Sequence, residues 1–523
     1  MPTWPAVVSF LAAALPTTLA FAALAFPRRA AQATAGAAGG ALFWALAVTL
    51  GPPITPAEAN IRVDVPAICL LLLVCALGAV VVRYSLTYLR GVPDLDRYLR
   101  AMLLTLSSVT MLVIADSVLV LALAWTGTSL ALHQLLTFYP HRTAALMAAH
   151  KKFLLSRLAD ACVAACVALI YLEVGSFDLD VIARWTSARA ELPTSMHVAA
   201  VFFAVAVVLR SAQLPFHGWL MQVMEAPTPV SALLHAGVVN IGGFVLITLA
   251  PLFDRAESAR LLLLCVGLFS TVVAALVMTT RVSVKVALAW STCAQMGFLL
   301  VQCGLGLWPL ALLHIVAHSL YKAHAFLRAG SAVDDWKVRH MAPPARQPSA
   351  LRSAAALVLG VGIALAGFAL LRAAWRQPLM MDASSWLSIA LVGAGVSSLF
   401  AAPVALGARR VGALAARAGA VLLLYAGAHA LADQVMPASS VAPSTAAWSL
   451  VGLGFVTLFV LKTSLQVRPA GRFARAIHPW LFAGLYLDET FTRLAFRLWP
   501  PRLDAPSRSR AAGQMPETIE VRA

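Results

Sequence analysis

Long apolar runs, each close to the length of a membrane-spanning helix, alternate with short polar stretches along this chain. A helix needs roughly 20 apolar residues to cross the hydrocarbon core of a bilayer. The pattern therefore predicts an all-α polytopic membrane protein with about 14 to 15 transmembrane helices. The expected spans are residues 5–26, 38–56, 64–84, 101–115, 117–138, 153–172, 197–213, 229–251, 260–279, 284–303, 307–329, 353–371, 385–407, 412–434 and 446–465.

Polar residues and prolines interrupt this pattern over residues 210–235, which read RSAQLPFHGWLMQVMEAPTPVSALLH. Pro215 removes a backbone donor at the end of one span, and two further prolines fix the start of the next span. A helix broken at membrane depth needs protein or water to satisfy its freed backbone groups, and such breaks tend to mark ion sites. We therefore expect a hydrated ion route here. In the alternative interpretations, Arg210 snorkels to the membrane surface and His235 is a hydrogen-bonded core histidine.

A second polar cluster lies inside the span near residues 307–329. His314, His318 and Lys322 recur every four residues, which places them on one face of a helix. The spacing could suit a metal, but no carboxylate or cysteine accompanies the histidines and the lysine occupies the next turn. A buried lysine can gain and lose a proton, so the cluster favours a hydrated His/Lys relay over a metal site.

Three further charged residues fall close to or within spans. Lys285 precedes the sequence VALAWST and is a candidate for the same relay. Asp160 follows Arg157 in the sequence HKKFLLSRLAD and forms either a structural ion pair or part of a proton route. Lys152, at the start of that segment, is expected to snorkel to the membrane surface.

Composition and charge support the membrane assignment. Of the 523 residues, 61% are hydrophobic and 12% charged, and the mean hydropathy is +0.84. Lysine and arginine gather in alternate loops, which predicts an N-terminus outside, an odd number of spans and a cytoplasmic C-terminus. The net charge of +17 then reflects topology and contact with anionic lipid headgroups. Nucleic-acid binding is a poor interpretation, because the charges are dispersed among loops and are not interleaved with exposed aromatic residues.

No soluble catalytic module is expected in this chain. The seven cysteines all fall within spans and form no C-x-x-C pair, so neither a disulfide framework nor an iron–sulfur site is supported. The sequence contains no phosphate-binding loop and no dinucleotide fingerprint. We expect N-terminal transmembrane helices over 1–100, a core with the first broken helix and the relay over 101–345, C-terminal transmembrane helices over 346–466, and a cytoplasmic basic amphipathic segment with a disordered tail over 467–523.

The polar clusters, in this order, resemble the antiporter-like proton-translocating subunits of respiratory complex I, NuoL most of all. The resemblance rests on RSAQLPFHGWLMQVMEAPTPVSALLHAG, KVALAWSTCAQMGF and HIVAHSLYKAHAFLRAGS. It implies an antiporter-like fold of two inverted five-helix repeats with broken helices. Within that superfamily, HKKFLLSRLAD and FHGWLMQVMEAPTPVSALLHAGVVNIGGFVLITLAPL look most like the DabB branch, the membrane subunits of inorganic carbon pumps.

The resemblance also implies roles for individual residues. It places His235, Lys285, His314, His318 and Lys322 at relay positions and Asp160 at a carboxylate position of the sixth helix. Three positions depart from the respiratory pattern: Thr126 stands where a glutamate is expected, Arg210 replaces a proton-carrying lysine, and Arg372 is displaced by one position from the exit lysine. These departures favour a route confined to the central cluster.

The implied function is an ion-conducting subunit, for H⁺ or Na⁺, in a bacterial cytoplasmic (inner) membrane. Its expected partner is a large soluble subunit resembling DabA, with a zinc site similar to that of carbonic anhydrases, which would hydrate CO₂ to bicarbonate. No cofactor or metal is expected in this chain itself. Two alternatives remain: a proton or Na⁺ translocating subunit of a complex I-like dehydrogenase, hydrogenase or Mrp-type antiporter, and a non-conducting membrane anchor.

Overall fold

The protein is a helical bundle throughout its described part. The computed structural model describes residues 4–34, 64–341, 349–374 and 442–501, together with scattered positions between 393 and 439. In these ranges the regular elements are helices, and nine segments are long and apolar enough to cross a membrane. The predicted all-α polytopic fold is therefore confirmed. The expected span at 38–56, all but position 393 of the span at 385–407, and about half of the span at 412–434 lie outside the described residues.

The helices follow the predicted spans closely, including the two spans that nearly touch around residue 116. Their bounds are α1 Trp4–Ala25, α4 Val65–Tyr88, α5 Leu95–Ile114, α6 Val118–Leu136, α7 Thr143–Val174, α8 Leu179–Ser187, α9 Thr194–Arg210, α10 Gly218–Gln222, α11 Thr228–Ala236, α12 Ile241–Thr248, α13 Ala250–Arg255, α14 Glu257–Met278, α15 Val284–Gly304, α16 Trp308–Leu327, α17 Ala332–Met341, α18 Ala350–Ala374, α21 Thr445–Val467, α22 Arg472–Phe482 and α23 Leu487–Leu498.

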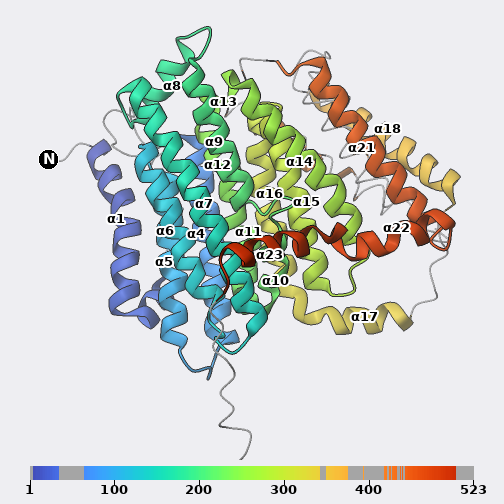
Figure 1. The fold of residues 1–523 in the computed structure, drawn as a ribbon, viewed down its shortest axis with the longest axis horizontal. Coiled ribbons are helices and arrows are strands. Elements are labelled where there is room, and N and C mark those ends of the chain that lie inside the picture. Colours follow the sequence, from blue (N-terminus) through green and yellow to red (C-terminus); the bar gives the residue numbers. More distant parts are fainter. Residues whose placement is uncertain are drawn as a thin grey trace, which may run out of the picture.

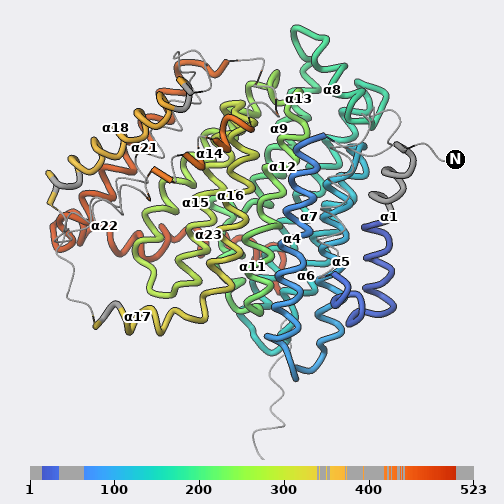
Figure 2. Tube along the Cα trace, turned by 180° about the vertical axis from the view of Figure 1, so that it is seen from behind, coloured from blue at the N-terminus to red at the C-terminus, as the bar shows by residue number. Residues whose placement is uncertain are grey.

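Most of the long helices stand side by side, with α8 and α13 at one end of the bundle and α17 at the other (Figure 1). Two helical paths through the bundle, α9–α10 and α11–α12, are interrupted. Between α9 and α10 the chain leaves the helical path over residues 211–217, and between α11 and α12 it passes through a short 3-10 turn at Val238–Asn240. These interruptions lie in the middle of the bundle, flanked by α7, α14, α15 and α16 (Figure 2).

Two glycines bring α14 and α15 into close contact. A Cβ atom added to Gly267 would lie 2.5 Å from the carbonyl oxygen of Gly297, and one added to Gly297 would lie 2.6 Å from that of Gly267. Small residues at a helix crossing let the two backbones approach, which is how membrane helices gain packing energy without a hydrophobic driving force. The crossing fixes α15, whose polar side chains face the interrupted helices.

The C-terminal arm, residues 472–498, runs across the bundle rather than along it. Its helices α22 and α23 cross in front of α14 and α15 and reach α7 (Figure 1). Arg281 donates a hydrogen bond to the carbonyl oxygen of Leu481 at 3.1 Å, and Phe491 packs edge-on against Phe216 with ring centroids 5.4 Å apart. The sequence predicted a short basic amphipathic segment here. The structure adds that this segment is packed against the break between α9 and α10.

The α14–α15 crossing gives a stability prediction. Replacing Gly297 by alanine should lower the free energy of unfolding by about 1–3 kcal/mol, because backbone atoms of Gly267 and Thr271 leave no room for a methyl group. The melting temperature of the detergent-purified protein measures the change. Gly452→Ala in α21 is the matched control, since an added Cβ there meets nothing within 4 Å. Equal melting temperatures for the two variants would contradict the close crossing.

Candidate ion-relay site

The predicted break after Arg210 is confirmed, and neighbouring helices satisfy its backbone. Helix α9 ends at Arg210 and α10 begins at Gly218. The amide of Leu214 donates to the hydroxyl oxygen of Ser270 in α14 at 3.1 Å, and the thiol of Cys293 in α15 lies 3.3 Å from the carbonyl oxygen of Ala212. Irregular backbone at membrane depth is stable only with such partners. The break is therefore stabilised by hydrogen bonds from α14 and α15.

His235 lies just before the second interruption, the 3-10 turn at Val238–Asn240. The prolines of the sequence did not predict this interruption. It is fully buried, with its ring stacked on Phe326 at a centroid distance of 4.3 Å. Its Nδ1 atom lies 3.1 Å from the hydroxyl oxygen of Thr292, which itself donates to the carbonyl oxygen of Leu288 at 3.0 Å. With the Thr292 hydrogen used in that way, Nδ1–H is the donor to Thr292 and Nε2 remains an acceptor.

Lys322 shares an acceptor with this chain of hydrogen bonds. Its ammonium group donates to the carbonyl oxygen of Leu288 at 3.0 Å and to the hydroxyl oxygen of Ser291 at 2.8 Å. The residue is fully buried, and no carboxylate of the described chain pairs with it. The carbonyl oxygen of Leu288 thus accepts from both sides, so α15 holds Lys322 of α16 close to the hydrogen-bonded chain of His235 in α11 without itself passing a proton.

His318 and His314 continue the polar face of α16, as their spacing predicted. Their ring centroids are 5.9 Å apart, and Nδ1 of His314 lies 2.8 Å from the side-chain oxygen of Gln302. His318 is 3% exposed, and neither of its ring nitrogens has a hydrogen-bond partner among the described residues. Within the same residues, no group of three potential metal ligands is found. The α16 cluster is thus a row of titratable groups that leads away from Lys322.

Lys285 lies apart from this row. It is half-buried and donates to the hydroxyl oxygen of Thr228 at 2.7 Å, which in turn lies 3.3 Å from the hydroxyl of Tyr88. None of the described hydrogen bonds joins Lys285 to His235 or Lys322. Its position, where α15 and α11 begin, fits the edge of a relay better than its centre.

Asp160 and Arg210 form a buried ion pair, so the sequence alternative in which Arg210 snorkels is wrong. The side chain of Arg210 is 7% exposed, and its guanidinium carbon lies 4.3 Å from the ring centroid of Trp125. Asp160 pairs with Arg210 through one oxygen and with Arg157 at 2.7 Å through the other, and it accepts a hydrogen bond from Thr126 at 2.8 Å. Thr126, which replaces a glutamate of the respiratory pattern, therefore contacts a carboxylate supplied by α7.

The prediction that Lys152 snorkels is also wrong. Its side chain points into the bundle, the residue is 5% exposed, and its ammonium group donates to the carbonyl oxygen of Ser129 at 2.6 Å and to the Ser129 hydroxyl at 2.9 Å. Snorkelling needs a free path to the headgroups. Here α6 closes that path, because it packs directly on α7 at this level.

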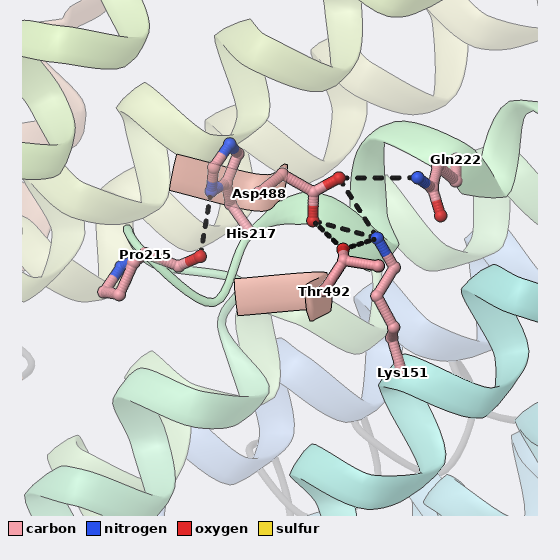
Figure 3. Close-up of polar contacts among 6 residues, drawn as sticks. All are labelled: Lys151, Pro215, His217, Gln222, Asp488 and Thr492. Atoms are coloured by element: carbon pink, nitrogen blue, oxygen red, sulfur yellow. Dashed lines mark hydrogen bonds and ion pairs between the residues drawn. The ribbon is translucent and has the colours of Figure 1, made fainter. Parts of the chain in front are cut away.

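Sequence reasoning missed the contact between Lys151 and the C-terminal arm. Lys151 is fully buried, and it donates to both oxygens of Asp488, at 2.9 and 3.1 Å, and to the hydroxyl of Thr492 at 3.0 Å (Figure 3). Gln222 of α10 also points its amide at Asp488, at 3.4 Å. The carboxylate sits directly on Gly218, where an added Cβ would overlap it. The arm therefore closes over the start of α10.

The site and the fold define an antiporter-like membrane subunit with an ion-translocating domain. Residues 115–343 match the family model described as NADH:quinone oxidoreductase/Mrp antiporter, TM. The chain is 40% identical to the probable inorganic carbon transporter subunit DabB of Hydrogenovibrio crunogenus over 82% of each chain. It is 37% identical to the probable subunit DabB2 of Halothiobacillus neapolitanus, over 86% of this chain and 82% of that one. The chain belongs to the DabB family, and the predicted resemblance is confirmed.

Solved structures agree on the fold. A chain of the Mrp complex from Dietzia sp. DQ12-45-1b is 25% identical, with a TM-score of 0.52 over 94% of this chain and 54% of that chain. A chain of the membrane-bound sulfane sulfur reductase, an archaeal respiratory membrane complex, superposes with a TM-score of 0.57 over 93% of this chain and 99% of the other. At 18% identity, the second match supports the fold alone.

The Lys151–Asp488 contact gives a second prediction. Asp488→Ala should lower the free energy of unfolding by about 2–3 kcal/mol, because removing the carboxylate leaves a buried ammonium group unpaired. The melting temperature in detergent measures the loss, and limited trypsin digestion at Arg493 and Arg497 reports release of the arm. Glu489→Ala, at an exposed neighbouring position, is the control.

A double variant separates pairing from packing. Lys151→Met combined with Asp488→Leu should recover most of the lost stability, since an apolar pair carries no desolvation cost. If the single Asp488→Ala variant melts like wild type and resists trypsin, the arm is not held by this contact.

Proposed function

We propose that the chain is the ion-conducting membrane subunit, for H⁺ or Na⁺, of an energy-coupled complex that accumulates inorganic carbon. The family membership supports the carbon-transport setting, and the antiporter-like domain supports ion translocation. Ion flow through this chain would drive one-way hydration of CO₂ to bicarbonate on a large soluble zinc-containing subunit resembling DabA. We place the complex in a bacterial cytoplasmic membrane, with the N-terminus outside and the C-terminus in the cytoplasm, from the Lys and Arg counts of the loops.

The observation that carries the proposal is the burial of Lys322 on neutral acceptors of α15, close to His235, which is held by the same helix. Both residues are fully buried and titratable. An ammonium group held only by neutral acceptors in a protein interior is costly, whereas a lysine that exchanges its proton lowers that cost by becoming neutral. The arrangement therefore suits transient protonation rather than a permanent ion pair.

Water is the partner that the remaining buried polar atoms require. Nε2 of His235, both ring nitrogens of His318, and Oδ1 of Asn240 are buried without a hydrogen-bond partner among the described residues. Buried polar groups without partners are rare, and ordered water commonly fills that role. Waters at these atoms would join the histidines to Lys322 and complete a proton path along α16.

Two other functions receive less support. A subunit of a complex I-like dehydrogenase, hydrogenase or Mrp-type antiporter would share the fold. However, the DabB relative is 40% identical over 82% of this chain, whereas an NADH-quinone oxidoreductase subunit L is 32% identical over 52% of it. A non-conducting anchor would have no need for a buried lysine on neutral acceptors, because such a group destabilises a purely structural core.

Replacing Lys322 by methionine tests the proposal. We expect uncoupler-sensitive uptake of labelled inorganic carbon to fall to background in cells that carry this chain with its soluble partner, because the relay loses its exchangeable proton. Lys462→Met is the matched control, since Lys462 also lies in a span but is exposed. Both variants must reach wild-type levels in the membrane fraction. Wild-type uptake by the Lys322 variant would reject the proposed relay.

A further inference from the structure

Two buried lysines of this chain are held in the same way. Lys322 donates to one backbone carbonyl and one serine hydroxyl, both in α15. Lys152 likewise donates to one backbone carbonyl and one serine hydroxyl, both of Ser129 in α6. Neither lysine pairs with a carboxylate in the described chain. Since the proposed relay rests on this coordination at Lys322, the same coordination at Lys152 suggests the same chemistry there.

A small cavity adjoins Lys152. Its volume is about 20 Å³, and its lining includes Lys152, Ser129, Arg210, Trp219 and Val238. A cavity that admits a water needs roughly 10–15 Å³, so this one has room for a single molecule. The indole N–H of Trp219, which is 3% exposed, and two nitrogens of Arg210 have no hydrogen-bond partner among the described residues. The cavity thus has unpaired donors and needs an acceptor, such as water or the lone pair of a neutral amine.

A second, more open cavity lies between neighbouring turns of the same two helices, α6 and α7. It has a volume of about 230 Å³ and is lined by His133, Thr137, His150 and Phe153, among others. His133 stands one helical turn beyond Ser129, on the same face of α6. Its Nδ1 atom is buried without a partner in the described chain. His133 thus lines the open cavity, and Ser129, one turn away on α6, lines the cavity of Lys152.

The ionisable groups around Lys152 differ in whether they can release a proton. Arg210 and Arg157 share the single carboxylate of Asp160, so their positions are fixed but only one of their two charges is compensated. Two further titratable groups lie nearby: His133 on α6, and His150 on α7, which lines the same open cavity as His133. An arginine does not release its proton in a protein, whereas a lysine or histidine can. Of these groups, the two arginines keep their protons and Asp160 is held by both of them, whereas Lys152 and His133 are the basic groups that can exchange a proton.

We propose that Lys152 is the proton-carrying residue of the first half of the core, loaded through the open cavity beside His133 and discharging toward the interruption near Val238. The Arg210–Asp160 pair acts beside it as a fixed charge pair. This inference rests on the proposed ion-conducting function and locates its first exchangeable group. It moves that role from the α9 position, where Arg210 stands, to α7.

Three substitutions at one position test the inference in cells that carry the full chain and its soluble partner. Lys152→Met and Lys152→Arg should each lower uncoupler-sensitive uptake of inorganic carbon by about a hundredfold, because neither side chain exchanges a proton. Lys152→His should keep part of the activity, with its pH profile displaced to lower pH, since imidazole releases its proton at lower pH than an amine. Lys462→Met is again the control, and melting temperatures in detergent report folding.

The results distinguish failure of the role of Lys152 from failure of the proposed function. Wild-type uptake by Lys152→Arg overturns the inference and shows that a fixed positive charge suffices at this position. Wild-type uptake by Lys152→Met, or a Lys152→His profile that coincides with wild type, also overturns it. If Lys322→Met retains uptake as well, the proposed function itself fails. Loss in Lys322→Met together with full activity in the Lys152 variants removes only the role of Lys152.

Discussion

The cost of leaving polar groups without partners inside a hydrocarbon layer organises this structure. The chain breaks between Arg210 and Gly218, and each freed backbone group there needs a partner from a neighbouring helix. Ser270 and Cys293 supply two of these partners from α14 and α15, which are held together at the Gly267–Gly297 crossing. The helix crossing, the break and the polar face of α15 therefore depend on one another, and the residues of the proposed relay pack against them.

Arginine and lysine have separate roles in this structure. The buried arginine of α9 is paired with a carboxylate and stacked on an aromatic ring, which suits a guanidinium that keeps its charge. The buried lysines Lys152 and Lys322 are held by neutral oxygens instead. A compensated charge stabilises geometry, whereas an ammonium group on neutral acceptors is poised between charged and neutral forms. On this basis the paired arginine has a structural role, and the two lysines are the proposed proton carriers.

Local patterns in the sequence predicted most of the bundle and part of the site. Apolar run length located the spans, the prolines located the first break, and the four-residue spacing aligned His314, His318 and Lys322 on one face. Contacts between distant segments were not predictable, because no local signal pairs Lys151 with a carboxylate 337 positions away. The same limit applies to Thr126, which stands where the respiratory pattern has a glutamate. Aligning this sequence with the respiratory pattern does not show that Asp160, on the next helix, places a carboxylate against both Thr126 and Arg210.

The C-terminal arm connects the surface of the bundle to its interior through adjacent residues of α7. Lys151 is held by Asp488 of the arm, and Lys152 is held by Ser129 of α6. Successive side chains of an α-helix point about 100° apart, so one rotation of α7 sets both contacts at once. Asp488 also rests on Gly218, at the start of α10. The arm thus fixes the rotation of α7 and the position of α10 together, and with them the two walls of the cavity that Lys152 shares with Arg210 and Trp219.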